Sequence, residues 1–124
     1  IAQGQYTDSE KNGKWKITTG DYTEEGNYII GLKDGQWKSY YSNGTLKFKG
    51  NYLQGNPDGQ HLYYYDTGKL KEEQYYRTGI RQRTWKKFDE NGAPFLTITY
   101  KDDVEVSING VKINLPESDT KLIK

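Results

Sequence analysis

The sequence predicts an all-β fold, an antiparallel meander of tandem β-hairpin repeats that forms one elongated, twisted sheet. Three observations predict it. Glycine- and aromatic-containing segments recur about every 24 residues, Asn-Gly and Thr-Gly pairs follow the aromatic runs, and aromatic residues make up 15% of the chain. Aromatic and β-branched runs between turn residues are typical of strands. No stretch of the sequence has the periodicity of an amphipathic helix.

Composition explains how so polar a chain can fold. Its 124 residues suffice for one domain, yet the hydrophobic fraction is only 32% and the mean hydropathy is −1.07. Disordered chains share this polarity but are poor in aromatic residues, whereas this chain has 12 Tyr, 3 Trp and 3 Phe. Because each aromatic ring buries a large area, we expect the core to be aromatic.

The repeat sets the domain organisation. We predict one repeat domain over 1–124, with a short N-terminal unit at 4–25 and three fuller units at 26–49, 50–73 and 74–100. Two of the fuller units begin with Gly-Asn-Tyr, 24 residues apart. A shorter first unit is typical of the end of a repeat array.

Each unit is expected to be one hairpin with two kinds of turn. Asn-Gly at 43–44 and 91–92 and Thr-Gly at 67–68 occupy one turn position. Asn-Gly is favoured in type I′ turns because both central residues there need positive φ. The glycines at 31–35 and 55–59 predict a second, looser turn at the other end of the hairpin.

The end of the chain departs from the repeat. Alternating aliphatic residues on both sides of an Asn-Gly pair at 109–110 predict a capping hairpin over 101–115. Such a cap protects the last edge of the sheet from pairing with other chains. Residues 116–124 are expected to form a frayed tail.

The repeats share the motif Tyr-x-x-Gly-x-x-x-Gly-x-Trp-x-x-Tyr-x-x-x-Gly-x-Leu. One copy consists of Tyr28, Gly31, Gly35, Trp37, Tyr40, Gly44 and Leu46. The next copy consists of Tyr52, Gly55, Gly59, His61, Tyr64, Gly68 and Leu70. Over residues 4–100 the motif resembles the bacterial variant of the MORN repeat. Three positions depart from it: His61 stands where Trp is expected, Arg83 where Gly is, and Pro94 where Leu is.

The resemblance implies an array of β-hairpins and a function in binding. Some bacterial members of the family, of the YwqK type, are described as antitoxin-like. Eukaryotic MORN proteins are scaffolds proposed to touch membranes or partner proteins. We therefore expect a non-catalytic protein-interaction or scaffold module that binds another protein, with antitoxin-like blocking as one specific form.

Residues for catalysis are sparse. His61 is the only histidine and the chain has no cysteine, so a catalytic triad, a His cluster and a thiolate metal site are all excluded. No serine lies in a Gly-x-Ser-x-Gly elbow. The acidic group at 102–105 is expected to be a solvated turn. We expect no enzymatic activity, no metal and no cofactor.

Charge and hydropathy limit the partners and the location. With 18 Lys and Arg against 17 Asp and Glu, the chain lacks the basic surplus of a nucleic-acid binder. No apolar run approaches the roughly 20 residues that span a bilayer. Because the chain begins with Ile1 rather than Met, we expect export to the periplasm, the cell envelope or the medium, with a cytoplasmic protein as the alternative.

Two aromatic columns provide candidate binding residues. Equivalent positions in successive hairpins lie about 10 Å apart. One column is Trp15, Trp37, His61 and Trp85, and the other, three residues on, is Tyr40, Tyr64 and Phe88. The odd offset predicts opposite faces of the sheet. One hypothesis is a surface for a glycan, a peptide or a protein, formed by Trp37, Tyr40, His61, Tyr64, Trp85 and Phe88. The alternative is that both columns only stabilise a thin sheet.

A basic segment is a second candidate. It comprises Arg77, Arg81, Arg83, Lys86 and Lys87, with no acidic residue between them. An acidic partner or an anionic lipid surface fits such a patch. In the alternative, these cations keep an exposed hairpin soluble and discourage edge pairing.

A second function stays open at the level of sequence. A carbohydrate or cell-wall ligand could bind an aromatic stripe, as in choline-binding repeats, where adjacent hairpins form aromatic cages. Here Trp37 and Trp85 are each followed by lysine rather than by tandem aromatic residues, which favours the protein-interaction hypothesis. An open meander could also pair edge to edge and form an oligomer.

Overall fold

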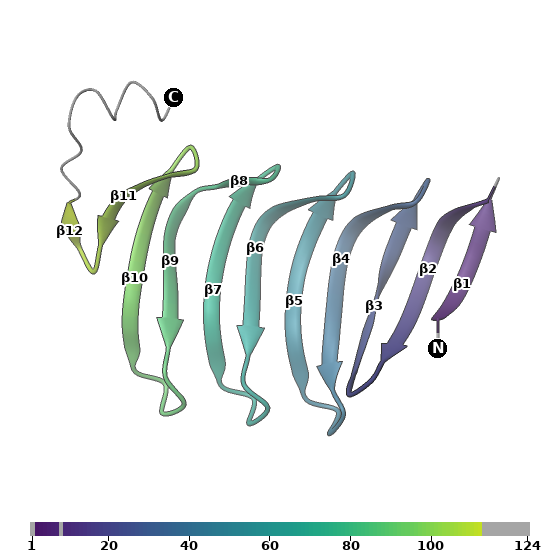
Figure 1. Ribbon diagram of the computed structural model, residues 1–124, viewed down its shortest axis with the longest axis horizontal. Helices are drawn as coiled ribbons and strands as arrows, with labels where there is room; N and C mark the ends of the chain where they lie inside the picture. The colour runs from purple at the N-terminus through teal and green to yellow at the C-terminus, as the bar shows by residue number, and fades with distance from the viewer. Residues whose placement is uncertain (1, 8, 113–124) are drawn as a thin grey trace.

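The computed structural model describes residues 2–7 and 9–112, which form one antiparallel sheet (Figure 1). Its first strands are β1 (Ala2–Thr7), β2 (Glu10–Thr19), β3 (Tyr22–Ile29), β4 (Leu32–Tyr41), β5 (Leu46–Leu53) and β6 (Asn56–Tyr64). The others are β7 (Leu70–Arg77), β8 (Ile80–Arg81), β9 (Arg83–Phe88), β10 (Pro94–Lys101), β11 (Val104–Ile108) and β12 (Val111–Lys112). The strands follow chain order across the sheet, except that the short β8 pairs with β7 beside β9. The predicted all-β meander is confirmed.

The sheet is a single curved layer, with strands side by side from one end to the other (Figure 1). A sheet face is normally buried against a second layer of structure. In this fold the rows of side chains on the sheet itself must provide the core. No helix of the described residues is long and apolar enough to span a bilayer.

The hairpin loops at 42–44, 66–68 and 90–92 contain three residues. In the first, the N–H of Gly44 donates to the carbonyl of Tyr41 at 2.9 Å, and the N–H of Tyr41 donates to the carbonyl of Thr45 at 2.8 Å. Only the glycine of the loop has positive φ, 87°. This is a type I turn followed by a bulge. The type I′ turn predicted for Asn-Gly at 43–44 is therefore wrong, and so is the one predicted at 91–92, where Gly92 has positive φ and Asn91 does not.

The tight type I′ turns lie at the opposite ends of the strands, where a looser turn was predicted. Both central residues have positive φ at 30–31, 54–55, 78–79 and 102–103. The later glycines of the predicted loose turns, Gly35 and Gly59, have φ of 76° and 78° and form bulges inside β4 and β6. The two-residue turn expected at 109–110 is present, with φ of 50° and 79°.

Backbone hydrogen bonds join successive type I′ turns. The N–H of Gly31 donates to the carbonyl of Lys11, and the N–H of Gly55 donates to the carbonyl of Lys33, both at 2.8 Å. The same bond recurs from Gly79 to Pro57 and from Asp103 to Arg81. We call this side of the sheet the turn edge. Because each turn holds the next, the turn edge is a continuous hydrogen-bonded stack.

The core lies within a row of rings across one face, which we call the aromatic spine and whose first ring, Tyr6, is 63% exposed. The spine consists of Tyr6, Trp15, Tyr28, Trp37, Tyr52, His61, Tyr76, Trp85 and Tyr100. Contacting neighbours meet edge to face, with ring centroids 5.0–5.9 Å apart. This is the preferred geometry of aromatic pairs. The face that carries the spine is called the spine face below.

Glycine makes room for the largest rings of the spine. A Cβ on Gly26 would overlap the ring of Trp37, and a Cβ on Gly4 would overlap the ring of Trp15. The indole N–H of Trp37 donates to the carbonyl of Asn27 at 2.9 Å, so its polar atom is satisfied. Trp37 is consequently only 1% exposed in a sheet without a second layer.

The opposite face carries a second, weaker apolar row. It consists of Tyr40, Leu46, Tyr64, Leu70 and Phe88, all half-buried. Tyr40 pairs across strands with Leu46, and Tyr64 pairs in the same way with Leu70. Cross-strand pairs of this kind stabilise a sheet without a covering layer.

The C-terminal hairpin caps the repeats by extending the sheet. Strand β11 pairs with β10, and β12 pairs with β11. The predicted capping hairpin at 101–115 is present as far as residue 112, and 113–115 lie outside the described residues. The predicted tail at 116–124 also lies outside them.

The first prediction concerns the glycine beneath Trp37. Substitution Gly26→Ala should lower the free energy of unfolding by about 1–3 kcal/mol, because the added methyl group forces the indole out of its position. Urea denaturation measures the loss. Gln74→Ala is the matched control, since Gln74 occupies the equivalent position beside Trp85 and already has a side chain. Equal losses in the two variants would contradict this account of the core.

Candidate binding site

The aromatic spine is interrupted once among the described residues, between Trp37 and Tyr52. A hollow of about 220 Å³ opens there on the spine face. We call it the notch and define it by six of its lining residues: Glu24, Lys33, Trp37, Lys47, Tyr52 and Tyr63. Phe48 contributes a further apolar wall. The notch is therefore a hollow in the apolar core with charged groups at its rim.

Lys33 bridges the interruption. It follows the type I′ turn at 30–31 and pairs with Tyr28 across β3 and β4. Its ammonium lies 4.6 Å from the ring centroid of Trp37 and 5.2 Å from that of Tyr52. The same ammonium lies 3.5 Å from the carboxylate of Glu24. Cation–π attraction and an ion pair thus hold Lys33 in place.

Lys47 reaches the notch because of a bulge. The pairing of β4 with β5 shifts between Ser39 and Tyr40, and Lys47 is the extra residue of β5 at that point. Its ammonium lies 4.2 Å from the ring centroid of Tyr22 and 5.6 Å from that of Tyr41. A bulge redirects a side chain in this way.

The phenols of the notch are hydrogen-bond donors at neutral pH. Burial raises the pKa of Tyr63 to about 12, with smaller contributions from Tyr52, Tyr76 and Glu72. The pKa of Tyr52 is raised by burial first and by the charge of Glu24 second. Both side chains keep their protons and can donate to an anionic group.

A smaller version of the notch occurs two repeats later. This hollow has a volume of about 130 Å³, and its lining includes Glu72, Trp85, Lys87, Leu96 and Tyr100. These residues are the equivalents, 48 positions on, of Glu24, Trp37, Ser39, Phe48 and Tyr52. The hollow therefore recurs in the two units that combine Trp with Glu, those of Trp37 and Trp85.

The middle unit has His61 in place of Trp, and its surroundings change with it. His61 Nε2 lies 2.7 Å from the carbonyl of Asn51, so the imidazole takes over the hydrogen bond of the indole. Phe48 stands where the Trp units have Glu24 and Glu72, and its ring centroid lies 5.3 Å from that of His61. Phe48 fills the space that the smaller imidazole leaves.

The structure distributes the six predicted aromatic residues over two faces. Trp37 and His61 are buried in the spine, and Trp85 is half-buried there. Tyr40, Tyr64 and Phe88 belong to the apolar row of the opposite face. The six residues therefore form no single surface. With Trp37 only 1% exposed, its ring face is closed to a stacked sugar.

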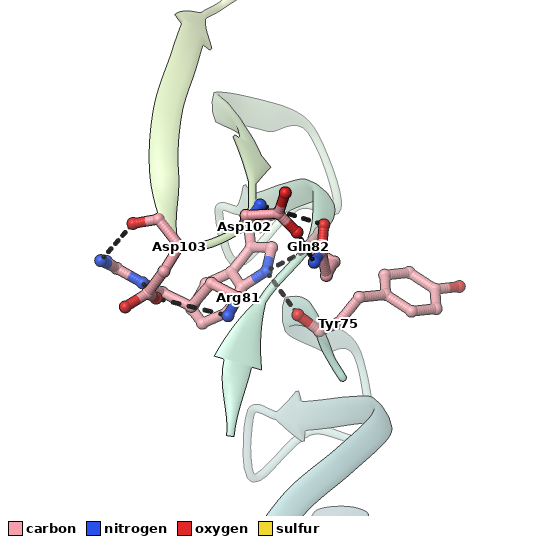
Figure 2. Close-up of polar contacts among 6 residues, drawn as sticks. Tyr75, Arg81, Gln82, Asp102 and Asp103 are labelled. Carbon is pink, nitrogen blue, oxygen red and sulfur yellow. Dashed lines mark hydrogen bonds and ion pairs between the residues drawn. The ribbon is translucent and has the colours of Figure 1, made fainter. Parts of the chain in front are cut away.

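The basic segment is also dispersed. Arg77 pairs with Asp102 at 3.1 Å. Arg81 pairs with Asp103 at 2.6 Å (Figure 2). The hydrogen bond from Arg81 holds the pKa of Asp103 below its ordinary value. The Arg83 guanidinium lies over the ring of Tyr75, 5.0 Å from its centroid.

The two lysines of that segment, Lys86 and Lys87, are adjacent in β9 and point to opposite faces. They pair across strands with Glu73 and Glu72. The five cations therefore do not form one basic surface. Among the described residues, no three His, Asp or Glu side chains are grouped so that they could hold a metal ion.

The sequence interpretation missed the charged rim of the notch. One signal for it is present: a cation lies four positions before each Trp of the spine, as Lys11, Lys33 and Arg81. Before His61 that position is Pro57. Lys11 and Lys33 lie over the rings of Trp15 and Trp37, and Arg81 lies over the ring of Tyr100 beside Trp85.

A family model described as MORN repeat variant matches three segments, 33–54, 57–78 and 84–102. Together they cover just over half of the 124 residues. The chain belongs to the MORN repeat variant family. Each matched segment contains a hairpin with a three-residue loop, first β4 with β5 and then β6 with β7 and β9 with β10. Membership suggests a repeat-type binding or scaffold module. No curated protein matches this MORN repeat variant chain significantly.

One prediction concerns pH. Burial is the main reason that the pKa of His61 lies below its ordinary value of 6.5, while the Asn51 carbonyl and Asp58 oppose the shift. The fold therefore favours neutral imidazole, and the unfolded chain binds more protons below about pH 6.5. Stability from this group is present above pH 6.5 and is lost as the pH falls toward the folded pKa.

Urea denaturation at pH 7.5 and 5.5 tests the sign. His61 is the only histidine, and histidine is the side chain that ordinarily titrates in this range. The loss of stability between the two values should shrink in His61→Gln, which keeps an N–H donor for Asn51. An equal loss in both proteins would show that another group is responsible.

Another prediction concerns the match between His61 and Phe48. Substitution His61→Trp should cost about 1–3 kcal/mol, because the larger ring meets Phe48. Adding Phe48→Glu, which recreates the combination found at Trp37 and Trp85, should recover part of that loss. A double-mutant cycle in urea should give a favourable coupling of about 1 kcal/mol or more. Additive effects would mean that the two side chains do not compensate for each other.

Proposed function

We propose that this MORN repeat variant protein is a non-catalytic protein-interaction module that binds its partner along the turn edge. One observation carries the proposal. Ile29, Ile30, Leu32 and Leu53 lie together at this edge with 52%, 70%, 49% and 45% of their surface exposed. We call these four residues the edge patch. Exposed apolar clusters of this kind mark interaction sites.

The edge patch is held by the fold. Ile29 pairs with Leu32 across the type I′ turn. The side chain of Leu32 lies against Gly55 of the next turn, close enough that a Cβ there would be 3.3 Å from it. The hydrogen bond from Gly55 to Lys33 fixes the spacing of the two turns. A partner would therefore meet an ordered surface and would bind without having to order it.

Backbone strain supports the same surface. Ile30 has φ of 48°, in a region that β-branched residues rarely adopt. Asn or Gly would fit that position better. A strained, exposed isoleucine is explained if its side chain serves binding rather than folding.

Support for a non-catalytic module comes from His61. It is the only histidine in the chain, it is 2% exposed, and its Nε2 is engaged with the backbone. A general base must reach the substrate. Blocking the surface of another protein, as an antitoxin does, is one form that this binding could take.

The experiment separates binding from stability. Ile30→Asn should raise the melting temperature because Asn tolerates positive φ. It should also weaken binding to a partner isolated by proximity labelling and then titrated in purified form, by about tenfold for a lost anchor. The reason is that Ile30 is the most exposed apolar residue of the edge patch, at 70%, and the substitution replaces it with a polar one.

Thr78→Asn is the matched control. Thr78 occupies the same turn position two units later, with φ of 46°, and lies outside the edge patch. This variant should gain stability and keep its affinity. If Ile30→Asn is stabilised and still binds as tightly as the wild type, the edge patch is not the interaction surface.

A further inference from the structure

We propose that the notch is a second binding site, specific for an acidic peptide segment. In this assignment a ligand carboxylate accepts hydrogen bonds from Lys47 and from the phenols of the notch, while an adjoining apolar side chain packs on Phe48. The notch lies on the spine face. Leu32 of the edge patch and Lys33 of the notch are adjacent in β4 and so point to opposite faces. The site therefore does not depend on the proposed function of the turn edge.

Charge is the first argument. Three lysines contribute to the lining, Lys33, Lys38 and Lys47. Lys38 pairs across strands with Glu25, and Lys33 is ion-paired with Glu24. In the described part of the chain, Lys47 has no acidic partner and lies over two tyrosine rings. One ammonium at the notch is thus available to an anion.

The polar groups of the notch favour the same ligand. Tyr52 and Tyr63 keep their phenolic protons at neutral pH and donate hydrogen bonds. Charge-assisted hydrogen bonds from ammonium and hydroxyl donors to a carboxylate are stronger than neutral ones. An uncharged ligand would leave Lys47 unpaired.

A cationic ligand fits less well. The ammonium of Lys33 already lies over the rings of Trp37 and Tyr52, where a foreign cation would have to bind. Such a ligand would have to displace Lys33 and would then face the positive charge of Lys47. The ammonium of Lys33 therefore already occupies the position between the two rings that a cationic ligand would need.

Size limits the ligand to a side chain. A hollow of about 220 Å³ is smaller than the roughly 300–1,000 Å³ of pockets that enclose whole cofactors or drug-sized molecules. One carboxylate-bearing side chain and part of a neighbour fit this space. The rest of a peptide would lie across the open spine face.

The related hollow near Trp85 provides an internal comparison. The equivalents of Lys33 and Lys47 there are Arg81 and Phe95. Arg81 is paired with Asp103, and Phe95 has no charge. Lys87 also lines that hollow, but it pairs across strands with Glu72, a carboxylate of the same lining. The preference for an acidic ligand therefore belongs to the notch and not to the fold in general.

The test is the fluorescence anisotropy of a labelled synthetic peptide in which Glu and Phe alternate, titrated with the full chain. We expect saturable binding that weakens about tenfold in Lys47→Gln, because one charge-assisted hydrogen bond is lost. Lys71→Gln is the matched control. Lys71 is the equivalent residue of the next unit and lies 5.6 Å from the ring centroid of Tyr65, outside the notch. It should bind as the wild type does.

Three further arms decide the outcome. The same peptide with Gln for Glu should bind at least about tenfold more weakly, and free glutarate should compete only at far higher concentration. The Ile30→Asn variant should bind the acidic peptide normally, so this site and the turn edge can fail separately. Absence of saturable binding, equal binding of the Gln peptide, equal losses in Lys47→Gln and Lys71→Gln, or glutarate competing as well as the peptide would each overturn the proposal. Circular dichroism confirms that every variant is folded.

Discussion

The fold depends on the contact between a large ring and a glycine of the preceding strand. A one-layer sheet offers no second surface on which to bury apolar groups, so each indole is laid flat across its own sheet. The indoles of Trp15 and Trp37 are buried because the neighbouring strand has no side chain at Gly4 and Gly26, whereas Trp85, beside Gln74, is only half-buried. The indole N–H then reaches a backbone carbonyl of the same neighbour, as it does from Trp37 to Asn27. The same position thus buries the indole ring and gives its N–H a hydrogen-bond acceptor. Tyrosine rings lie between the indoles along the spine.

This arrangement explains why the unit with His61 differs at several positions. A smaller ring leaves space, which Phe48 takes, and it offers a poorer surface for a cation, which is absent at Pro57. The imidazole still makes the hydrogen bond to the backbone. His61, Phe48 and Pro57 therefore differ from their equivalents in the Trp37 unit for one reason, the smaller size of the imidazole ring. They also close the hollow that the Trp units leave open, so the available site lies in the unit of Trp37.

The sequence was sufficient for the parts of the fold that depend on spacing. The period of the aromatic residues and glycines predicted the antiparallel meander and the two faces of Trp37 and Tyr40. The turn types were exchanged because both a type I′ turn and a three-residue loop with a bulge need a residue with positive φ, which the glycine of Asn-Gly provides, and the pair alone does not show which of them forms. The position of Lys47 on the spine face could not be predicted from the sequence for a related reason. Strict alternation places it away from Phe48, and only the bulge in β5 brings it to the spine face. The ion pairs of Arg77 and Arg81 depend on a turn 25 and 22 residues later, which no local pattern reveals.

The hydrogen bonds between successive type I′ turns fix the spacing of the hairpins along the sheet. Each hairpin is fixed only to its neighbours, so the position of any unit is set by the number of units before it. Each hairpin of two strands lengthens the sheet by about 10 Å. The gain or loss of one hairpin before them would move the notch and the edge patch along the sheet by about 10 Å and would leave their residues unchanged. The distance of both sites from either end of the sheet could therefore be altered by repeat number alone.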